Sequence, residues 1–96
     1  MSGLQEATLV RVIEITNKKG LHARASAKFV QTVEGYDAEV MVTRAGETVG
    51  GTSIMGLMML SAGPGTSITI EARGKDAAQV MDAICSLVGS RFGEDD

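Results

Sequence analysis

The hydrophobic residues of this chain change their spacing several times within 96 residues, and this limits the folds that the chain can adopt. Stretches rich in β-branched residues alternate apolar and polar side chains, as strands with one buried face do. Other stretches repeat apolar residues every three or four positions, which is typical of a helix with one buried face. In chain order the sequence predicts a strand over residues 8–16, a helix over 23–34, a hairpin over 37–51, a short helix over 54–60, a strand over 66–72 and a helix over 77–90.

The order of these elements, β-α-β-β-α-β-α, predicts an α+β domain. We expect a four-stranded, mainly antiparallel sheet with the helices packed on one face. The length is close to a common domain size, and no repeat or linker is visible, so residues 1–96 should form a single domain. We expect an ordered core over about residues 8–90 with short flexible ends. The spacing of the elements leaves the order of the strands open.

The same patterns predict which side chains are buried. Val10 and Val12 fall on the opposite face of the first strand from its inward residues, and the pattern leaves open whether that face is covered. Asp76 is expected to cap the last helix. The predicted inward residues are Leu9, Ile13 and Ile15 in the first strand, Ala23, Ala27, Val30 and Phe29 in the first long helix, Ile68, Ile70 and Ala72 in the last strand, and Ala77, Val80, Met81, Ile84, Leu87 and Val88 in the last helix.

Composition excludes several classes of function. A net charge of −3, with one Tyr and two Phe, predicts no nucleic-acid binding. One cysteine, Cys85, and one histidine can form neither an internal disulfide nor a conventional zinc site, which indicates a reducing cytoplasm. No apolar run approaches the ~18 residues of a membrane span, and no export signal is evident. We therefore expect a cytoplasmic protein without membrane insertion, metal or bound cofactor.

The short helix IMGLMML is apolar around most of its circumference, so a small core cannot cover all of it. Ser53 is placed to cap it, and Leu57 and Leu60 should face the core. The remaining residues would form a soft, adaptable surface for a protein partner. Methionines are also ordinary core fillers, so a more deeply buried helix stays an alternative. We call the outward residues the docking patch: Ile54, Met55 and Met58.

His22, the single histidine, lies where a turn leads into the first long helix. The backbone N–H groups of Ala23 and Arg24 are unpaired at such a helix start and can bind an anion, which the helix dipole also favours. The same dipole and the Arg24 cation disfavour imidazolium, which would leave a nucleophilic imidazole nitrogen able to attack phosphorus. Alternatively, His22 only caps the helix or sits exposed at the turn. No Ser/His/Asp or Cys/His set is indicated, and the glycines match no nucleotide-binding loop.

The segment GLHARASAKFV, residues 20–30, resembles the active-site segment of HPr, the histidine-containing phosphocarrier of the bacterial sugar phosphotransferase system. The resemblance continues through EGYDAEVMV, GGTSIMGLMML and GPGTSITIEARGKD to the last helix, and so covers most of the chain. It implies an HPr-like open-faced β-sandwich. It also implies a stoichiometric phosphoryl carrier rather than an enzyme, without a cofactor of its own.

By resemblance, His22 is phosphorylated on Nδ1, and Arg24 neutralises the phosphoryl group. The donor would be Enzyme I, a magnesium-dependent protein charged by phosphoenolpyruvate, and the acceptor a type IIA protein or domain. Many HPr sequences have proline where this chain has Ala25, which removes local rigidity but no phosphate ligand. Ser53 aligns with a serine that an HPr serine kinase/phosphorylase modifies in some bacteria, although it can be a simple helix cap. We expect a monomer.

Two other functions remain open at this point. The chain can be a regulatory member of the nitrogen-related phosphotransferase branch, in which the phosphorylation state controls a target instead of sugar uptake. It can also be an adaptor that uses the methionine-rich helix and never carries phosphate.

Overall fold

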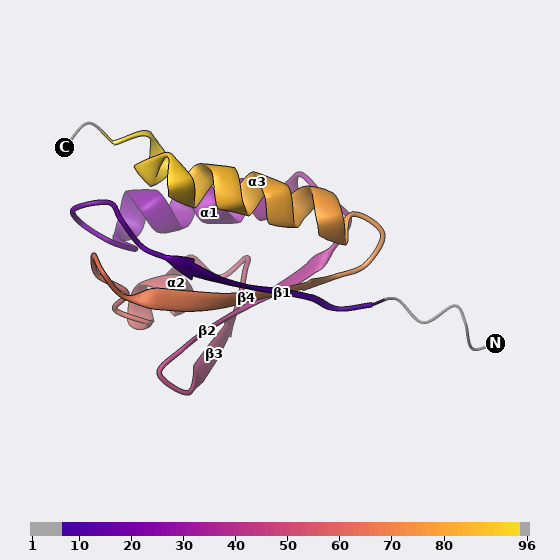
Figure 1. The fold of residues 1–96 in the computed structure, drawn as a ribbon, viewed down its shortest axis with the longest axis horizontal. Coiled ribbons are helices and arrows are strands. Elements are labelled where there is room, and N and C mark those ends of the chain that lie inside the picture. The colour runs from indigo at the N-terminus through magenta and orange to yellow at the C-terminus, as the bar shows by residue number, and fades with distance from the viewer. Residues whose placement is uncertain (1–6, 95–96) are drawn as a thin grey trace.

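The computed structural model describes residues 7–94, and its elements follow the predicted order (Figure 1). The predicted flexible residues at the N-terminus, up to residue 6, and the last two residues lie outside the described part of the chain. The strands are β1 (Leu9–Glu14), β2 (Glu39–Arg44), β3 (Glu47–Gly50) and β4 (Ser67–Arg73). The helices are α1 (Ala23–Glu34), α2 (Ile54–Met59), α3 (Ala77–Gly89) and a 3-10 turn, η2 (Arg91–Gly93).

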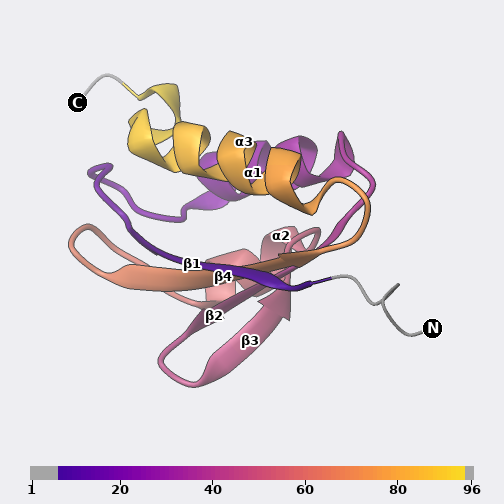
Figure 2. The same cartoon turned by 45° about the vertical axis from the view of Figure 1, so that its right-hand side comes forward.

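The four strands form one antiparallel sheet in the order β1-β4-β2-β3, which confirms the predicted class and supplies the strand order. Helices α1 and α3 lie side by side over one face, while the other face is open (Figures 1 and 2). Helix α2 packs beside β3 and against α1, and its inward leucines belong to the same core as the covered sheet face. Helices α1 and α3 therefore cover the face, and α2 closes the core beside β3. No helix in residues 7–94 has both the length and the apolar character to span a bilayer.

The alternation in the sheet places the inward side chains as predicted at most positions. Ile68, Ile70 and Ala72 on β4 are all fully buried. After β1, Ile15 is buried as well, while Ile13 is only partly buried and Leu9 is exposed, because β1 extends past the helices at its start. Val10 and Val12 are 53% and 69% exposed, so the second face of β1 is not covered.

Two predictions about the helices are wrong in detail. The inner face of α1 is turned relative to the predicted one: Phe29 and Val30 are buried as predicted, but Ala23 is exposed and Ala27 is only partly buried. The face that packs on the sheet consists of Ala25, Ser26, Phe29, Val30 and Val33. Asp76 precedes α3 but makes no side-chain cap; its Oδ2 accepts from the Asp37 backbone N–H at 2.8 Å and ties the α3 entry to the β2 entry.

The end of the chain also differs from the prediction, which placed the end of the ordered core at about residue 90. Phe92 is only 1% exposed and belongs to the core. Its carbonyl accepts from Lys28 Nζ at 2.5 Å, so η2 is fastened to α1. Arg91, Phe92 and Gly93 all have positive φ, and this sharp turn after α3 folds the chain back toward the start of α1.

Candidate functional site

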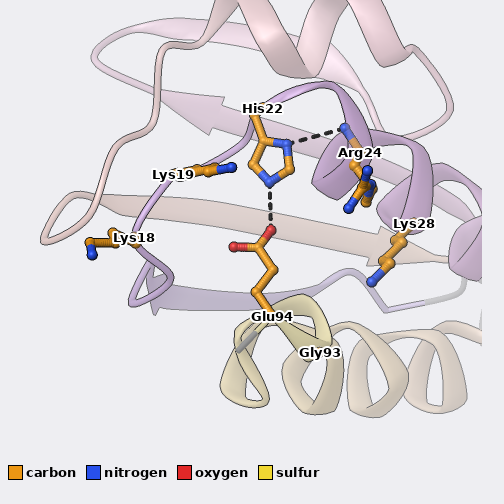
Figure 3. A pocket seen from close by; sticks show the side chains of 7 residues that line it. All are labelled: Lys18, Lys19, His22, Arg24, Lys28, Gly93 and Glu94. Carbon is orange, nitrogen blue, oxygen red and sulfur yellow. Dashed lines mark hydrogen bonds and ion pairs between the residues drawn. The ribbon is translucent and has the colours of Figure 1, made fainter. Parts of the chain in front are cut away.

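His22 is the N-cap residue of α1, with extended backbone angles that end the preceding loop. Its Nδ1 accepts a hydrogen bond from the Arg24 backbone N–H at 3.3 Å, and its carbonyl accepts from Ser26 N at 2.9 Å. The ring therefore lies across the start of the helix with Nδ1 toward the first turn (Figure 3). The side chain is 28% exposed, so a partner can reach it.

The loop before His22 is held against the loop that follows α2. The Leu21 N–H donates to the Ala62 carbonyl at 3.0 Å, and Ser26 Oγ, inside the core, donates to the Leu21 carbonyl at 3.2 Å. Gly20 has φ of +64°, and a Cβ there would lie 2.2 Å from the Ala62 oxygen. The close approach of these two backbones therefore requires glycine.

We expect Gly20→Ala to lower the free energy of unfolding by about 2 kcal/mol, because the new methyl group meets backbone and the positive φ strains an L-residue. Urea unfolding followed by circular dichroism measures the change. Gly46→Ala is the matched control, since Gly46 has φ of +84° but nothing within 4 Å of its Cβ position. Equal losses in the two variants would show that the contact with Ala62 contributes nothing.

Glu94, which the sequence did not single out, lies on the opposite edge of the His22 ring. Its Oε2 is 2.5 Å from His22 Nε2, and its Oε1 accepts from Asn17 Nδ2 at 3.1 Å. The hydrogen bond from His22 holds the pKa of the Glu94 carboxyl below its usual value, although burial acts in the opposite direction. Asn17 and Lys19 lower this pKa further. The pair thus stabilises the folded state above the ordinary titration range of glutamate, and this contribution is lost as pH falls through the lowered pKa.

The partners of the two ring nitrogens define the tautomer of His22. An ionised Glu94 can only accept hydrogen bonds, so His22 Nε2 must carry the hydrogen. The Arg24 N–H is a donor, so His22 Nδ1 must be the unprotonated nitrogen. The neutral ring that fits both partners has its lone pair on Nδ1, toward the helix start. This is the nitrogen that can act as a nucleophile.

Cations surround the ring in an open hollow of about 530 Å³. The residues that line it are Lys18, Lys19, His22, Arg24, Lys28, Gly93 and Glu94 (Figure 3). Four of them are lysine or arginine and one is a carboxylate, so this surface is locally positive although the whole chain has a charge of −3. Such a surface attracts anions, above all phosphoryl groups.

The docking patch lies where it was predicted, on α2. The Ser53 Oγ accepts from the Gly56 N–H at 2.9 Å and caps the helix, and Leu57 and Leu60 are buried. Residues Ile54, Met55 and Met58 are 40%, 69% and 39% exposed. Met59, at 68%, extends the same surface and was not predicted. A second hollow, lined by His22 and residues 61–63, joins the end of α2 to the histidine.

The structure brings together His22, Ala23 and Arg24 as expected, since they are consecutive. It adds Glu94 and Asn17, which sequence reasoning missed. A signal for part of the site was present: four of the nine Lys and Arg residues fall within positions 18–28 of an otherwise acidic chain. No comparable signal marks Glu94, whose place depends on the turn at Phe92.

Comparisons with known proteins give concordant findings. Residues 9–90 match a family model described as the PTS HPr component phosphorylation site. The phosphocarrier protein HPr of Neisseria meningitidis serogroup A is 52% identical over 86 residues, which cover 90% of this chain and 97% of that protein. The phosphocarrier protein NPr of Shewanella violacea is 41% identical over 90% of this chain and 94% of its own. A crystal structure of HPr-C-His from Thermoanaerobacter tengcongensis has a TM-score of 0.87 and 38% identity, covering 92% of this chain and 99% of that chain.

A single imidazole at a helix N-terminus, surrounded by cations on the surface of a small open-faced sandwich, defines the class of the protein: a phosphocarrier. The chain belongs to the HPr family.

Proposed function

We propose that His22 accepts a phosphoryl group from Enzyme I, charged by phosphoenolpyruvate, and transfers it to a type IIA protein or domain. The observation that carries this proposal is the orientation of the ring, in which Nδ1 is unprotonated and faces the first turn of α1. A nucleophile in this place meets an incoming phosphorus atom beside the backbone N–H groups of the helix start.

Attack by Nδ1 would bring the phosphoryl oxygens to the backbone N–H groups of Ala23 and Arg24. The Arg24 N–H, which donates to the Nδ1 lone pair before the reaction, would then donate to a phosphoryl oxygen instead. The Arg24 guanidinium lines the same hollow and makes no hydrogen bond or ion pair within residues 7–94, so it can turn onto the phosphate. The hollow is open, and a few donors hold the group weakly enough for onward transfer. This agrees with a stoichiometric carrier that completes its reacting site only with each partner.

The test is to incubate the protein with Enzyme I, magnesium and labelled phosphoenolpyruvate. We expect label that is acid-labile and alkali-stable, as a phosphohistidine is, and ¹⁵N–³¹P spectra that place it on Nδ1. Label on Nε2 would contradict the proposed orientation. Absence of label with an Enzyme I that charges another HPr would favour the adaptor that never carries phosphate.

The docking patch is proposed as the surface that both partners contact. Its residues are apolar and exposed, and residues 61–63, which follow α2 in the chain, line a hollow together with His22, so a partner seated on α2 would lie close to the histidine. The Arg44 guanidinium donates to the Leu60 carbonyl at 2.9 Å and fixes the end of α2. The patch is thus presented on a fixed element.

Replacing Met55 with glutamate should raise the Enzyme I concentration at half-maximal transfer by about tenfold, because a carboxylate must lose water in an apolar contact. Unfolding should not change, since Met55 is exposed. The matched control is Val12→Glu, because Val12 is also 69% exposed but lies on the open sheet face. Steady-state transfer measures both, and equal effects would rule out a specific role for the patch.

Ser53 is proposed as a regulatory phosphorylation site for an HPr serine kinase/phosphorylase. Its side chain is exposed at the start of α2, where a phosphate meets the helix amides favourably. The added charge would stand beside Met55 and oppose partner binding. The cap to Gly56 gives the serine a structural role in addition.

The nitrogen-related branch is the second candidate, because a relative named NPr is 41% identical over most of the chain. Its defining property would be transfer to a regulatory type IIA protein without dependence on a sugar permease. Assay of labelled protein against both kinds of acceptor separates the two branches. In either case we propose a cytoplasmic monomer that meets one partner at a time, consistent with the free thiol of Cys85.

A further inference from the structure

The C-terminal turn delivers Glu94 to His22, although the two residues are 72 positions apart. The turn itself is anchored by buried Phe92 and by Lys28 Nζ, which donates to the Phe92 carbonyl. The carboxylate is also held from the other side. Asn17, which is fully buried, donates one amide hydrogen to the Gly20 carbonyl at 2.9 Å and the other to Glu94 Oε1.

The orientation of the Asn17 amide follows from its two acceptors. If oxygen and nitrogen exchanged places, an oxygen would face both the Gly20 carbonyl and the Glu94 carboxylate, which is repulsive. The amide oxygen Oδ1 has no partner within residues 7–94 and is buried, so the fold tolerates an unsatisfied acceptor while it keeps the donor directed at Glu94. Glu94 therefore has one oxygen fixed by the scaffold and the other directed at the His22 ring.

Charges face the His22–Glu94 pair from two elements. Two lysines of the preceding loop and two cations of α1 line the same hollow: Lys18, Lys19, Arg24 and Lys28. Glu94 is the single carboxylate among the residues that line it. Arg24 begins on the Nδ1 side, where its backbone N–H contacts the ring, whereas among residues 7–94 the hydrogen-bond partner of Nε2 is Glu94.

We propose that Glu94 is a positioning residue of the phosphoryl relay, which keeps the hydrogen on His22 Nε2 and balances the charge of the phosphorylated ring. This inference rests on the proposed function. When the Nδ1 lone pair forms its bond to phosphorus, the bond from phosphorus to the donor breaks and that electron pair stays with the donor. Nε2 keeps its hydrogen, so the substituted ring carries a positive charge next to the carboxylate. No proton has to move.

Transfer from the phosphorylated ring to the acceptor protein is the reverse of this reaction. When the acceptor attacks phosphorus, the Nδ1–P bond breaks and its electron pair returns to Nδ1, which regenerates the neutral ring with Nε2–H. A protonated ring is the better leaving group, so a carboxylate that keeps the hydrogen on Nε2 favours release as well as acceptance. Glu94 acts through His22 and does not touch phosphorus.

The first measurement needs no partner protein and therefore does not depend on the proposed function. In ¹H–¹⁵N spectra of the unphosphorylated protein, we expect a slowly exchanging, strongly downfield Nε2 hydrogen, as in short charge-assisted hydrogen bonds. It should be lost in Glu94→Ala and kept in Glu34→Ala, an exposed glutamate at the far end of α1. A Nε2 signal that is unchanged in Glu94→Ala would overturn the proposal.

The second measurement is the rate of single-turnover transfer to and from the protein. We expect Glu94→Gln, whose amide oxygen can still accept from Nε2–H but carries no charge, to slow both directions about tenfold at saturating partner. Glu34→Gln changes the net charge equally and should not slow either. Thermal unfolding confirms that the variants are folded. Wild-type rates in Glu94→Gln would overturn the role of Glu94, whereas failure of the proposed function would appear as no label on the wild type.

Discussion

His22→Ala should abolish phosphoryl acceptance from Enzyme I while the fold persists. The chain has no second histidine, so within this sequence no other imidazole can replace Nδ1. The side chain is partly exposed, and its loss removes the hydrogen bond to the Arg24 N–H and the contact with Glu94. Loss of a helix cap costs about 1 kcal/mol, which a domain of this size tolerates. Labelling with radioactive phosphoenolpyruvate and urea unfolding measure the two effects separately.

A matched variant, His22→Asn, distinguishes the nucleophile from the cap. Asparagine is among the best N-cap residues, so its side-chain oxygen can accept from the Arg24 N–H and restore the stability lost with alanine. It offers no imidazole nitrogen, so acceptance should remain absent. If His22→Asn or His22→Ala still took up acid-labile label, the phosphoryl group would reside elsewhere and His22 would be a structural cap.

Phe92→Ala should lower the free energy of unfolding by about 3–5 kcal/mol. Phe92 is one of the largest fully buried side chains, and truncating a buried phenylalanine leaves a cavity that a close-packed core does not fill. In a domain of about 100 residues, such a loss lowers the melting temperature by roughly 12 °C or more. Scanning calorimetry and urea unfolding measure it. The release of Glu94 from His22 should accompany the loss of packing.

Met59→Ala is the control for Phe92→Ala, because Met59 is 68% exposed and should change stability by no more than about 0.5 kcal/mol. The comparison tests whether the residues after α3 are packed, as in the structure, or flexible, as the sequence predicted. Equal stability of Phe92→Ala and Met59→Ala would mean that the chain after α3 contributes nothing to the fold. The same result would also mean that Phe92 does not hold Glu94 beside His22, on which the proposed role of Glu94 depends.

Much of the fold could be predicted because its signals are local. Period-two alternation identified β4 with its three inward residues, and the bounds of α1 were correct at both ends. Ser53 was correctly assigned as a cap because a capping side chain bonds to amides only two or three residues ahead. The exposure of Ile54, Met55 and Met58 was also predictable, since a short helix that is apolar on all sides must expose part of its surface.

Other details were decided by neighbours that the sequence does not identify. The inner face of α1 is set by how the helix lies on the sheet, so alanines at helical spacing could not fix it. Asp76 has the chemistry of a cap, but the Asp37 N–H is close enough to compete for its carboxylate. Gly56 in α2, which lowers helix propensity, is explained by a contact, since a Cβ there would lie 2.9 Å from the Val49 Cβ.

The sequence by itself determined the proposed reacting group: one histidine, directly before a helix, with Arg24 two positions later. These residues are neighbours in the chain, and the geometry of a helix start fixes their relation whatever else the fold does. Only the tertiary structure decided what the other ring nitrogen, Nε2, contacts. Its partner is Glu94, which Asn17 holds across 77 residues of sequence and which the buried turn at Phe92 brings to the ring. A long-range contact of this kind follows from packing of the whole core, which no local pattern encodes.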